Sequence, residues 1–150
     1  MFIRRRNSPV AERGAAAVEF ALIVPALLLL IFGIADFSWV FNQQVSLSNA
    51  AREASRYYAV HEHSGGTPAQ AVAWGKNTAP TINAATWSAA STVFVVSQGC
   101  DPTKAGYDSD PALTGKVLAR IEVPVATLTG FFESLLTNPL KAKGMTVCGG

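Results

Sequence analysis

The chain has 150 residues, enough for one membrane segment and one small domain. Apolar residues make up 49% and charged residues 15%, well below the quarter that is usual in soluble proteins. The net charge of +2 is unevenly distributed. Residues 1–14 hold four arginines and one glutamate and carry +3, whereas the rest of the chain carries −1. Nucleic-acid-binding proteins carry their basic excess on the folded domain, so this distribution excludes nucleic acid as an expected partner.

A nearly unbroken apolar run follows the basic leader. Between Ala15 and Ala35 only Glu19 is ionisable. At a rise of about 1.5 Å per residue the run would be roughly 30 Å long, the thickness of a bilayer's hydrocarbon core. The arginines precede the run, so the positive-inside rule puts the N-terminus in the cytoplasm and the C-terminal part outside. A carboxylate at membrane depth costs a few kcal/mol, so we expect Glu19 to have a partner.

The helical pattern continues past the apolar run. No glycine or proline occurs between Asp36 and Gly65, so we expect one helix from about residue 15 to residue 61, roughly 70 Å long and kinked at Pro25. Trp39 and Phe41 lie where an interfacial aromatic belt is expected. The outer half is amphipathic, and its apolar side chains recur at steps of three or four, apart from one wider gap: Phe37, Phe41, Val45, Ala51, Ala54 and Tyr58. The stripe Phe37, Phe41 and Val45 is expected to be a packing seam, within the chain or between subunits.

The residues after the long helix predict a small α+β head. Gly65 should stop the helix, and the sequence Thr67-Pro68-Ala69-Gln70 predicts a capped second helix to about Asn77. Residues 79–91 carry no clear pattern. Alternation and β-branched content predict strands at 92–98, 116–125 and 141–148, with a short helix at 127–136 and a weak point at Gly144. The expected segments are a leader (1–14), a transmembrane helix (15–36), its amphipathic continuation (37–63) and an extracytoplasmic head (64–150) with a short antiparallel sheet packed on the helix.

The chain has two cysteines, Cys100 and Cys148, and both fall in the outside part. An even number in an oxidising compartment predicts one disulfide, which would join the last strand to the end of the first. In the chain-entropy model, closing the loop between Cys100 and Cys148 stabilises the fold by about 4 kcal/mol. Two free thiols are the alternative.

Two conventional interpretations of the apolar run leave features unexplained. A plain anchor that keeps Met1 explains the length and orientation but not Glu19. A secretory signal cut after Ala35 would use the small residues Gly33 and Ala35, but the helical pattern continues through that cut, and the run is longer than a usual signal.

A prepilin-type interpretation explains more. A cut after Gly14 on the cytoplasmic face would free the α-amine of Ala15, which is four residues and one helical turn before Glu19. The amine can then neutralise the carboxylate, and the helix dipole favours an acid in the first turn. This interpretation accounts for the glycine, the small residues and the acid together, and it is the one that we favour.

The motif RGAAAVEFAL, the P…LLLL…FG..DF spacing and the segment NAAREASRYYAV resemble the TadE-like minor pilins (pseudopilins) of the Tad, or Flp-type, tight-adherence pilus. The resemblance covers about residues 12–60. It implies a pilin-like fold and a non-enzymatic role in pilus assembly. Gly14 would be the last leader residue and Ala15 the first mature one, and Glu19 and Phe20 would serve processing and subunit register. Asp36 stands where the family commonly has glutamate.

The resemblance also implies partners and a location. The partners would be a prepilin peptidase, other pilins, the pilus assembly platform proteins and the lipid bilayer. The protein would cross the bacterial inner membrane once, with its head in the periplasm or outside the cell. The alternatives are a single-pass anchor presenting an extracytoplasmic binding or adaptor module, and a secreted protein.

Other site chemistry has little support in the sequence. His61-Glu62-His63 lacks a further ligand at helical spacing, and Asp101, Asp108 and Asp110 fit no calcium-loop template. Both histidines lie in one tripeptide, which leaves no candidate catalytic triad, and there is no glycine-rich phosphate loop. We therefore expect no catalytic residue, metal or cofactor. Tyr57-Tyr58 is expected to pack the head on the helix, with a partner contact as the alternative.

Overall fold

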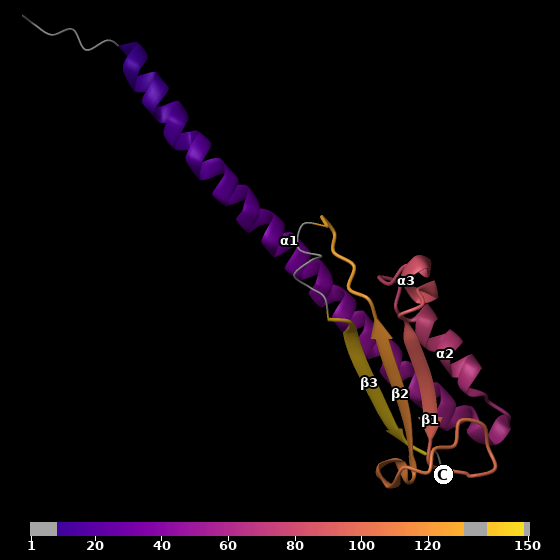
Figure 1. The fold of residues 1–150 in the computed structure, drawn as a ribbon. Helices are drawn as coiled ribbons and strands as arrows, with labels where there is room; N and C mark the ends of the chain where they lie inside the picture. Colours follow the sequence, from indigo (N-terminus) through magenta and orange to yellow (C-terminus); the bar gives the residue numbers. More distant parts are fainter. Residues whose placement is uncertain (1–8, 131–137, 149–150) are drawn as a thin grey trace, which may run out of the picture.

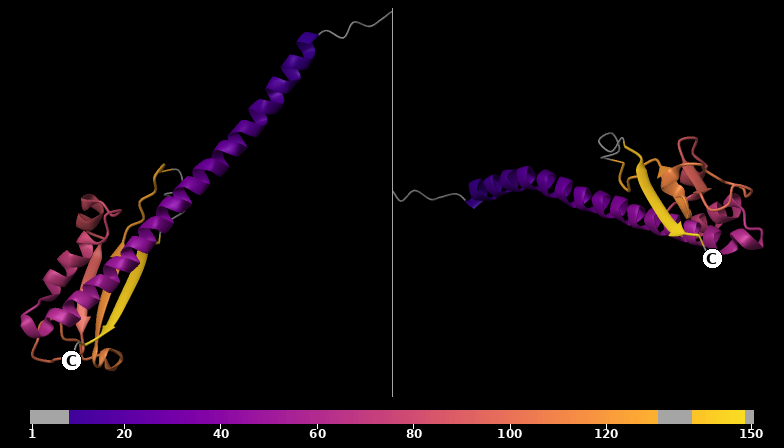
Figure 2. Two further views of the ribbon diagram at one scale, coloured as in Figure 1. Left: turned by 180° about the vertical axis from the view of Figure 1, so that it is seen from behind. Right: turned by 90° about the horizontal axis from the view of Figure 1, so that it is seen from below.

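The computed structural model describes residues 9–130 and 138–148, with side chains from Gly14 onward. Its dominant element is helix α1, Pro9–His61, which continues through Pro25. The expected single long helix is confirmed, but it begins at Pro9 rather than at Ala15, so the later part of the leader is helical. Figure 2 shows a shallow bend in the first part of α1, as expected of a helix that lacks one backbone N–H donor.

The N-terminal half of α1 projects away from the rest of the chain (Figures 1 and 2). The most apolar stretch of this helix has no buried residue, and the helix is long and apolar enough to cross a membrane. Leu22 and Ile23, for example, are 74% and 63% exposed. So much exposed apolar surface suits single-pass membrane anchoring.

The head contains a three-stranded antiparallel sheet of β1 (Val93–Gln98), β2 (Lys116–Val123) and β3 (Leu140–Val147), in the order β1-β2-β3. One face packs on the C-terminal half of α1 (Figure 1). The predicted alternation in β2 is confirmed, because its inward side chains are all fully buried: Val117, Ala119, Ile121 and Val123. The strand ends before Val125 because Pro124 has no N–H to donate to the ladder.

The smaller helices follow their capping signals. After α1, a short 3-10 turn, η1 (Glu62–Ser64), ends at Gly65 with φ +89°. Helix α2 (Pro68–Asn77) has the predicted capping box, in which Gln70 N–H donates to Thr67 Oγ1 and Thr67 N–H donates to Gln70 Oε1 at 2.9 Å. The segment without a clear pattern contains α3 (Ala84–Ser88), capped by the side chain of Asn83. A second 3-10 turn, η2, spans Pro111–Leu113.

The apolar stripe predicted for the outer half of α1 is correct only near its C-terminus. Ala51, Ala54 and Tyr58 are buried, but Phe37, Phe41 and Val45 are 74%, 61% and 45% exposed. The face that contacts the head nearer the membrane is polar, with Asp36 and Gln43 buried. These two side chains hydrogen-bond to backbone groups of the head. In this part of α1, hydrogen bonding rather than apolar burial therefore determines which face of the helix contacts the head.

The helix predicted at 127–136 is not formed in its first part. Residue 127 has no regular structure, residues 128–130 form bends, and residues 131–137 lie outside the described part of the chain. The segment leading into them is held by side chains of α1: Gln43 Nε2 donates to the Ala126 carbonyl at 2.6 Å.

Two glycines allow the head's backbone to contact α1. At Gly144 of β3 a Cβ would overlap the backbone of Ala51, and at Gly75 of α2 it would lie 2.9 Å from the Ala50 carbonyl oxygen. Gly144 is therefore not a weak point of the strand, as the sequence suggested, but a position where the strand backbone lies directly against α1. The alanines of α1 have short side chains, so β3 and α2 both approach the helix here.

Candidate functional site

The predicted processing residues lie on the exposed part of α1. Gly14, Ala15, Glu19 and Phe20 are all exposed, and Phe20 is exposed to 69%. A Cβ added at Gly14 would meet no atom within 4 Å, and its backbone is helical, so neither packing nor backbone conformation within the described residues requires a glycine there. Ala15 and Glu19 are four residues apart on one helix and share a face.

A buried carboxylate ties the head to α1 where the apolar run ends. Asp36 is 1% exposed, and its Oδ1 accepts the backbone N–H groups of Leu128 at 3.1 Å and Thr129 at 2.9 Å. The Thr129 hydroxyl donates to Oδ2 at 2.5 Å. We call these three hydrogen bonds, from Leu128 and Thr129 to Asp36, the Asp36 latch. Hydrogen bonds to an ionised acceptor are about twice as strong as neutral ones, so this carboxylate is well compensated for its burial.

The Asp36 latch fixes the head close to the end of the apolar run of α1. The Gln43 bond to Ala126 lies two turns further along the same face and holds the same segment. Sequence reasoning missed this site because it treated Asp36 as the end of the apolar run. The sequence shows only that Asp36 and Gln43 are two turns apart on one helix face, and nothing local names their partners in the head.

We expect Asp36→Ala to release residues 128 and 129 from α1 while leaving the β-sheet intact. The change leaves two backbone N–H groups without their acceptor, and each lost bond to a charged group costs about 1.5–3 kcal/mol. Hydrogen exchange of the full chain in detergent should show lost protection at Leu128 and Thr129. Asn42→Ala, at an exposed position of the same helix, is the matched control; unchanged protection in Asp36→Ala would contradict this role of the latch.

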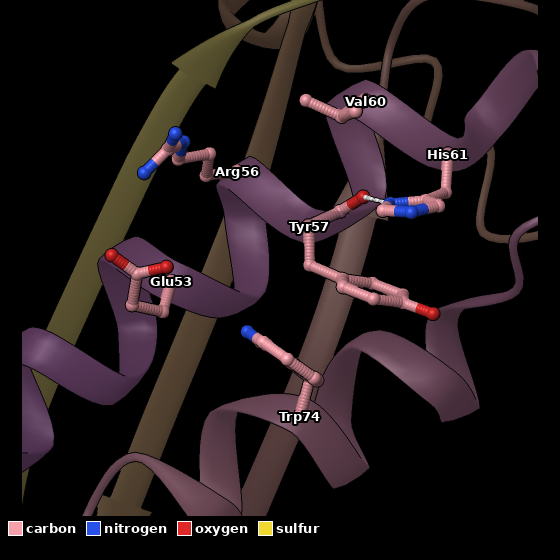
Figure 3. Close-up of a pocket in the computed structure, with 6 residues that line it drawn as sticks. All are labelled: Glu53, Arg56, Tyr57, Val60, His61 and Trp74. Carbon is pink, nitrogen blue, oxygen red and sulfur yellow. Dashed lines mark hydrogen bonds between the residues drawn. The ribbon is translucent and has the colours of Figure 1, made fainter.

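A surface hollow of about 380 Å³ lies between α1 and α2 (Figure 3). The ring of Tyr57 stacks between those of His61, at 4.2 Å between centroids, and Trp74, at 5.4 Å. Glu53 and Arg56 line the same hollow from α1. Aromatic rings with one charge of each sign suit a protein contact, and the hollow contains no nucleophile paired with a base.

The tyrosine pair packs the head on the helix, as predicted. Tyr58 is 1% exposed, and its hydroxyl donates to the Ala105 carbonyl at 2.6 Å. Its pKa is raised by burial and by the nearby negative charges of Glu62 and Asp101. Tyr57 is half-buried in the aromatic stack, so the first tyrosine borders the surface hollow and the second belongs to the core.

The predicted disulfide between Cys100 and Cys148 is present, with Cα atoms 6.1 Å apart. It joins the loop after β1 to the end of β3. The buried side chain of Gln98 organises the same loop, because its Oε1 accepts the N–H groups of Cys100 at 2.7 Å and Asp101 at 2.9 Å. The covalent bond and the glutamine together hold the end of the head farthest from the membrane run (Figure 1).

The residues considered for metal binding are separated or used in turns. His61 Nδ1 lies 2.9 Å from the Tyr57 carbonyl oxygen, whereas Glu62 is buried beside the disulfide. Asp101 Oδ1 accepts from the Thr103 N–H at 2.8 Å, and the Thr103 hydroxyl lowers the pKa of this carboxyl. Asp108 and Asp110 likewise accept backbone N–H groups two residues further on, the geometry of turn-capping aspartates.

The family comparison gives a match on α1. The model of the TadE-like protein family matches residues 14–56, which begin at the exposed glycine and end in the part of α1 that contacts the head. A search of curated proteins finds no match. Solved structures give no match either. The matched range includes Asp36 and the alanines that β3 and α2 contact. Residues 14–56 are thus similar to TadE-like proteins, and this similarity supports involvement of the chain in the Tad pilus system.

Proposed function

We propose that the protein is a minor pilin, or pseudopilin, that takes part in assembly of a Tad (Flp-type) pilus after a prepilin peptidase cuts behind Gly14. The observation that carries the proposal is the family match, which starts at Gly14 itself. The exposure of Gly14 and its lack of any packing role are consistent with recognition by a peptidase instead. The role is structural rather than enzymatic.

The proposed location follows from charge and topology. The arginine-rich leader stays in the cytoplasm, residues 15–36 cross the inner membrane, and the head lies outside. A disulfide in the head fits an oxidising compartment. Residues 37–63 then act as a rigid stem that carries the head at the membrane surface.

The proposed mechanism is physical. The apolar surface of α1 anchors the subunit in the lipid bilayer before assembly. During assembly the same surface is buried against helices of other pilins. Phe37, Phe41 and Val45 continue this exposed surface past the membrane, away from the face that contacts the head. The expected partners are therefore other pilins and the assembly platform, in addition to the prepilin peptidase.

Glu19 would set the register of these contacts. After the cut, the α-amine of Ala15 lies one turn away, and either this amine or that of a neighbouring subunit can neutralise the carboxylate. A buried ion pair contributes little net stability but penalises every alternative alignment that leaves the charge unpaired.

We expect Glu19→Ala to leave membrane insertion intact and to reduce piliation by tenfold or more, since about 1.4 kcal/mol is enough for that factor. Pili are counted by electron microscopy and sheared-fibre immunoblot, and membrane fractions are probed for the subunit. Asn42→Ala, at an exposed polar position of the same helix, is the control. Normal piliation with Glu19→Ala would exclude the register role.

An anchored adaptor is the second candidate, and the hollow at Tyr57 and Trp74 is the observation that favours it. An adaptor needs no cut behind Gly14 and would keep Met1. The two functions are therefore separated by the N-terminus of the mature protein.

A further inference from the structure

Glu62 is a buried acid without a hydrogen-bond partner. It is 1% exposed, and neither of its carboxylate oxygens has a partner among the described residues. Buried polar groups in native proteins are almost always paired, because an isolated charge in a low-dielectric interior is strongly unfavourable. An orphaned buried carboxylate therefore indicates that something else satisfies it in one state of the protein.

The neighbours of this carboxylate are the two sulfur atoms. A carboxylate oxygen of Glu62 and the Sγ atoms of Cys100 and Cys148 all lie within 4.8 Å of one another. They come from three places in the fold: the turn after α1, the loop after β1 and the end of β3. The separation of the two cysteine Cα atoms, 6.1 Å, suits a disulfide. Two thiolates on one small metal ion, each bonded at about 2.3 Å, require a similar separation.

We propose that, when the disulfide is reduced, Glu62, Cys100 and Cys148 bind one zinc ion. Reduction by a dithiol breaks the S–S bond, gives two cysteine thiols and converts the dithiol to its cyclic disulfide. Zinc then replaces the two thiol protons, which pass to water, and the Glu62 carboxylate supplies the third ligand. Two thiolates, one carboxylate and a water in the fourth position form a tetrahedral set that zinc accepts.

The ligand set discriminates among metals. Calcium and magnesium need six or more oxygen ligands or several retained waters, and two thiolates exclude both. His61 does not compete for the ion as placed, because its Nδ1 faces the Tyr57 carbonyl and its ring stacks on Tyr57. The buried carboxylate thus gains a cation in the reduced protein, at the position where the disulfide closes the head in the oxidised protein.

The test uses the full chain in detergent micelles, reduced with a phosphine and titrated with Co²⁺ as a spectroscopic substitute for zinc. The wild-type protein should develop thiolate-to-cobalt charge-transfer absorption that saturates at one ion per chain, and Zn²⁺ should abolish it. The oxidised protein should show none, because its sulfur atoms are bonded to each other.

Glu62→Gln should weaken zinc binding about tenfold or more, measured by competition with a chromogenic chelator. Removing a residue that only hydrogen-bonds to a metal ligand already costs about tenfold in affinity, and removing a ligand should cost at least as much. Glu53→Gln, at a half-buried glutamate on α1, should bind zinc as the wild type does. Formation of the Cys100–Cys148 disulfide in Glu62→Gln on oxidation shows that the variant folds. Absence of the charge-transfer band in the reduced wild type, or equal zinc affinity in Glu62→Gln, would overturn the proposal.

Discussion

Replacement of Gly144 by valine is expected to lower the free energy of unfolding of the head by about 3 kcal/mol or more. A side chain at this position would overlap the backbone of Ala51. This backbone belongs to α1, which cannot move away without losing its other contacts with the head. The strand would have to separate from α1, which would expose the buried faces of β2 and β3. Thermal or urea unfolding of the full chain in detergent, followed by near-ultraviolet circular dichroism, measures the effect.

Met145→Val is the matched control for this substitution. Met145 is the next residue of β3 and is 55% exposed, so its side chain points away from α1. A β-branched residue there favours the strand, and the expected change in unfolding free energy is within about 0.5 kcal/mol. If Gly144→Val were as stable as Met145→Val, the close approach of β3 to α1 would be wrong.

Gly14→Leu is expected to abolish maturation without disturbing the fold. A Cβ at Gly14 meets nothing in the described chain, and leucine is a better helix former than glycine. A lost cut would therefore report recognition by the peptidase rather than unfolding. The measurement is the mass of the membrane-extracted protein, which should retain residues 1–14.

Ala21→Leu provides the control for Gly14→Leu, because it adds the same side chain at an exposed position of the same helix. It should be processed normally. A Gly14→Leu protein that still loses the mass of residues 1–14 would contradict the proposed cut.

Local signals in the sequence predicted much of the fold. The glycine at 65 ends the helical region with a positive φ, Thr67 and Gln70 form the expected capping box, and the alternation in β2 buries the residues named in advance. These features depend on neighbouring residues and backbone chemistry, which the sequence displays directly. The disulfide followed from compartment and parity.

Features that depend on tertiary contact were not predictable in the same way. Apolar periodicity placed Phe37 and Phe41 on the packing face, but the head contacts the opposite, polar face through Asp36 and Gln43. Pairing a carboxylate with backbone groups 92 and 93 residues away leaves no local pattern. Gly144 appeared to weaken a strand because its partner, the backbone of Ala51, is distant in the sequence.

The candidate sites also differ in how far local sequence signals identify them. Gly14, Ala15 and Glu19 could be named from spacing alone, and the structure adds that they are exposed on one continuous helix. The Asp36 latch and the position of Glu62 against the disulfide needed three-dimensional coordinates, because each brings together residues from separate elements.

Determining the N-terminus of the mature protein tests the proposed function most directly. Intact mass spectrometry and N-terminal sequencing of the subunit from piliated cells should find Ala15 as the first residue, with its amine one turn from Glu19. A subunit that still begins at Met1 in cells making normal pili would leave that carboxylate without the proposed partner and would contradict the proposal.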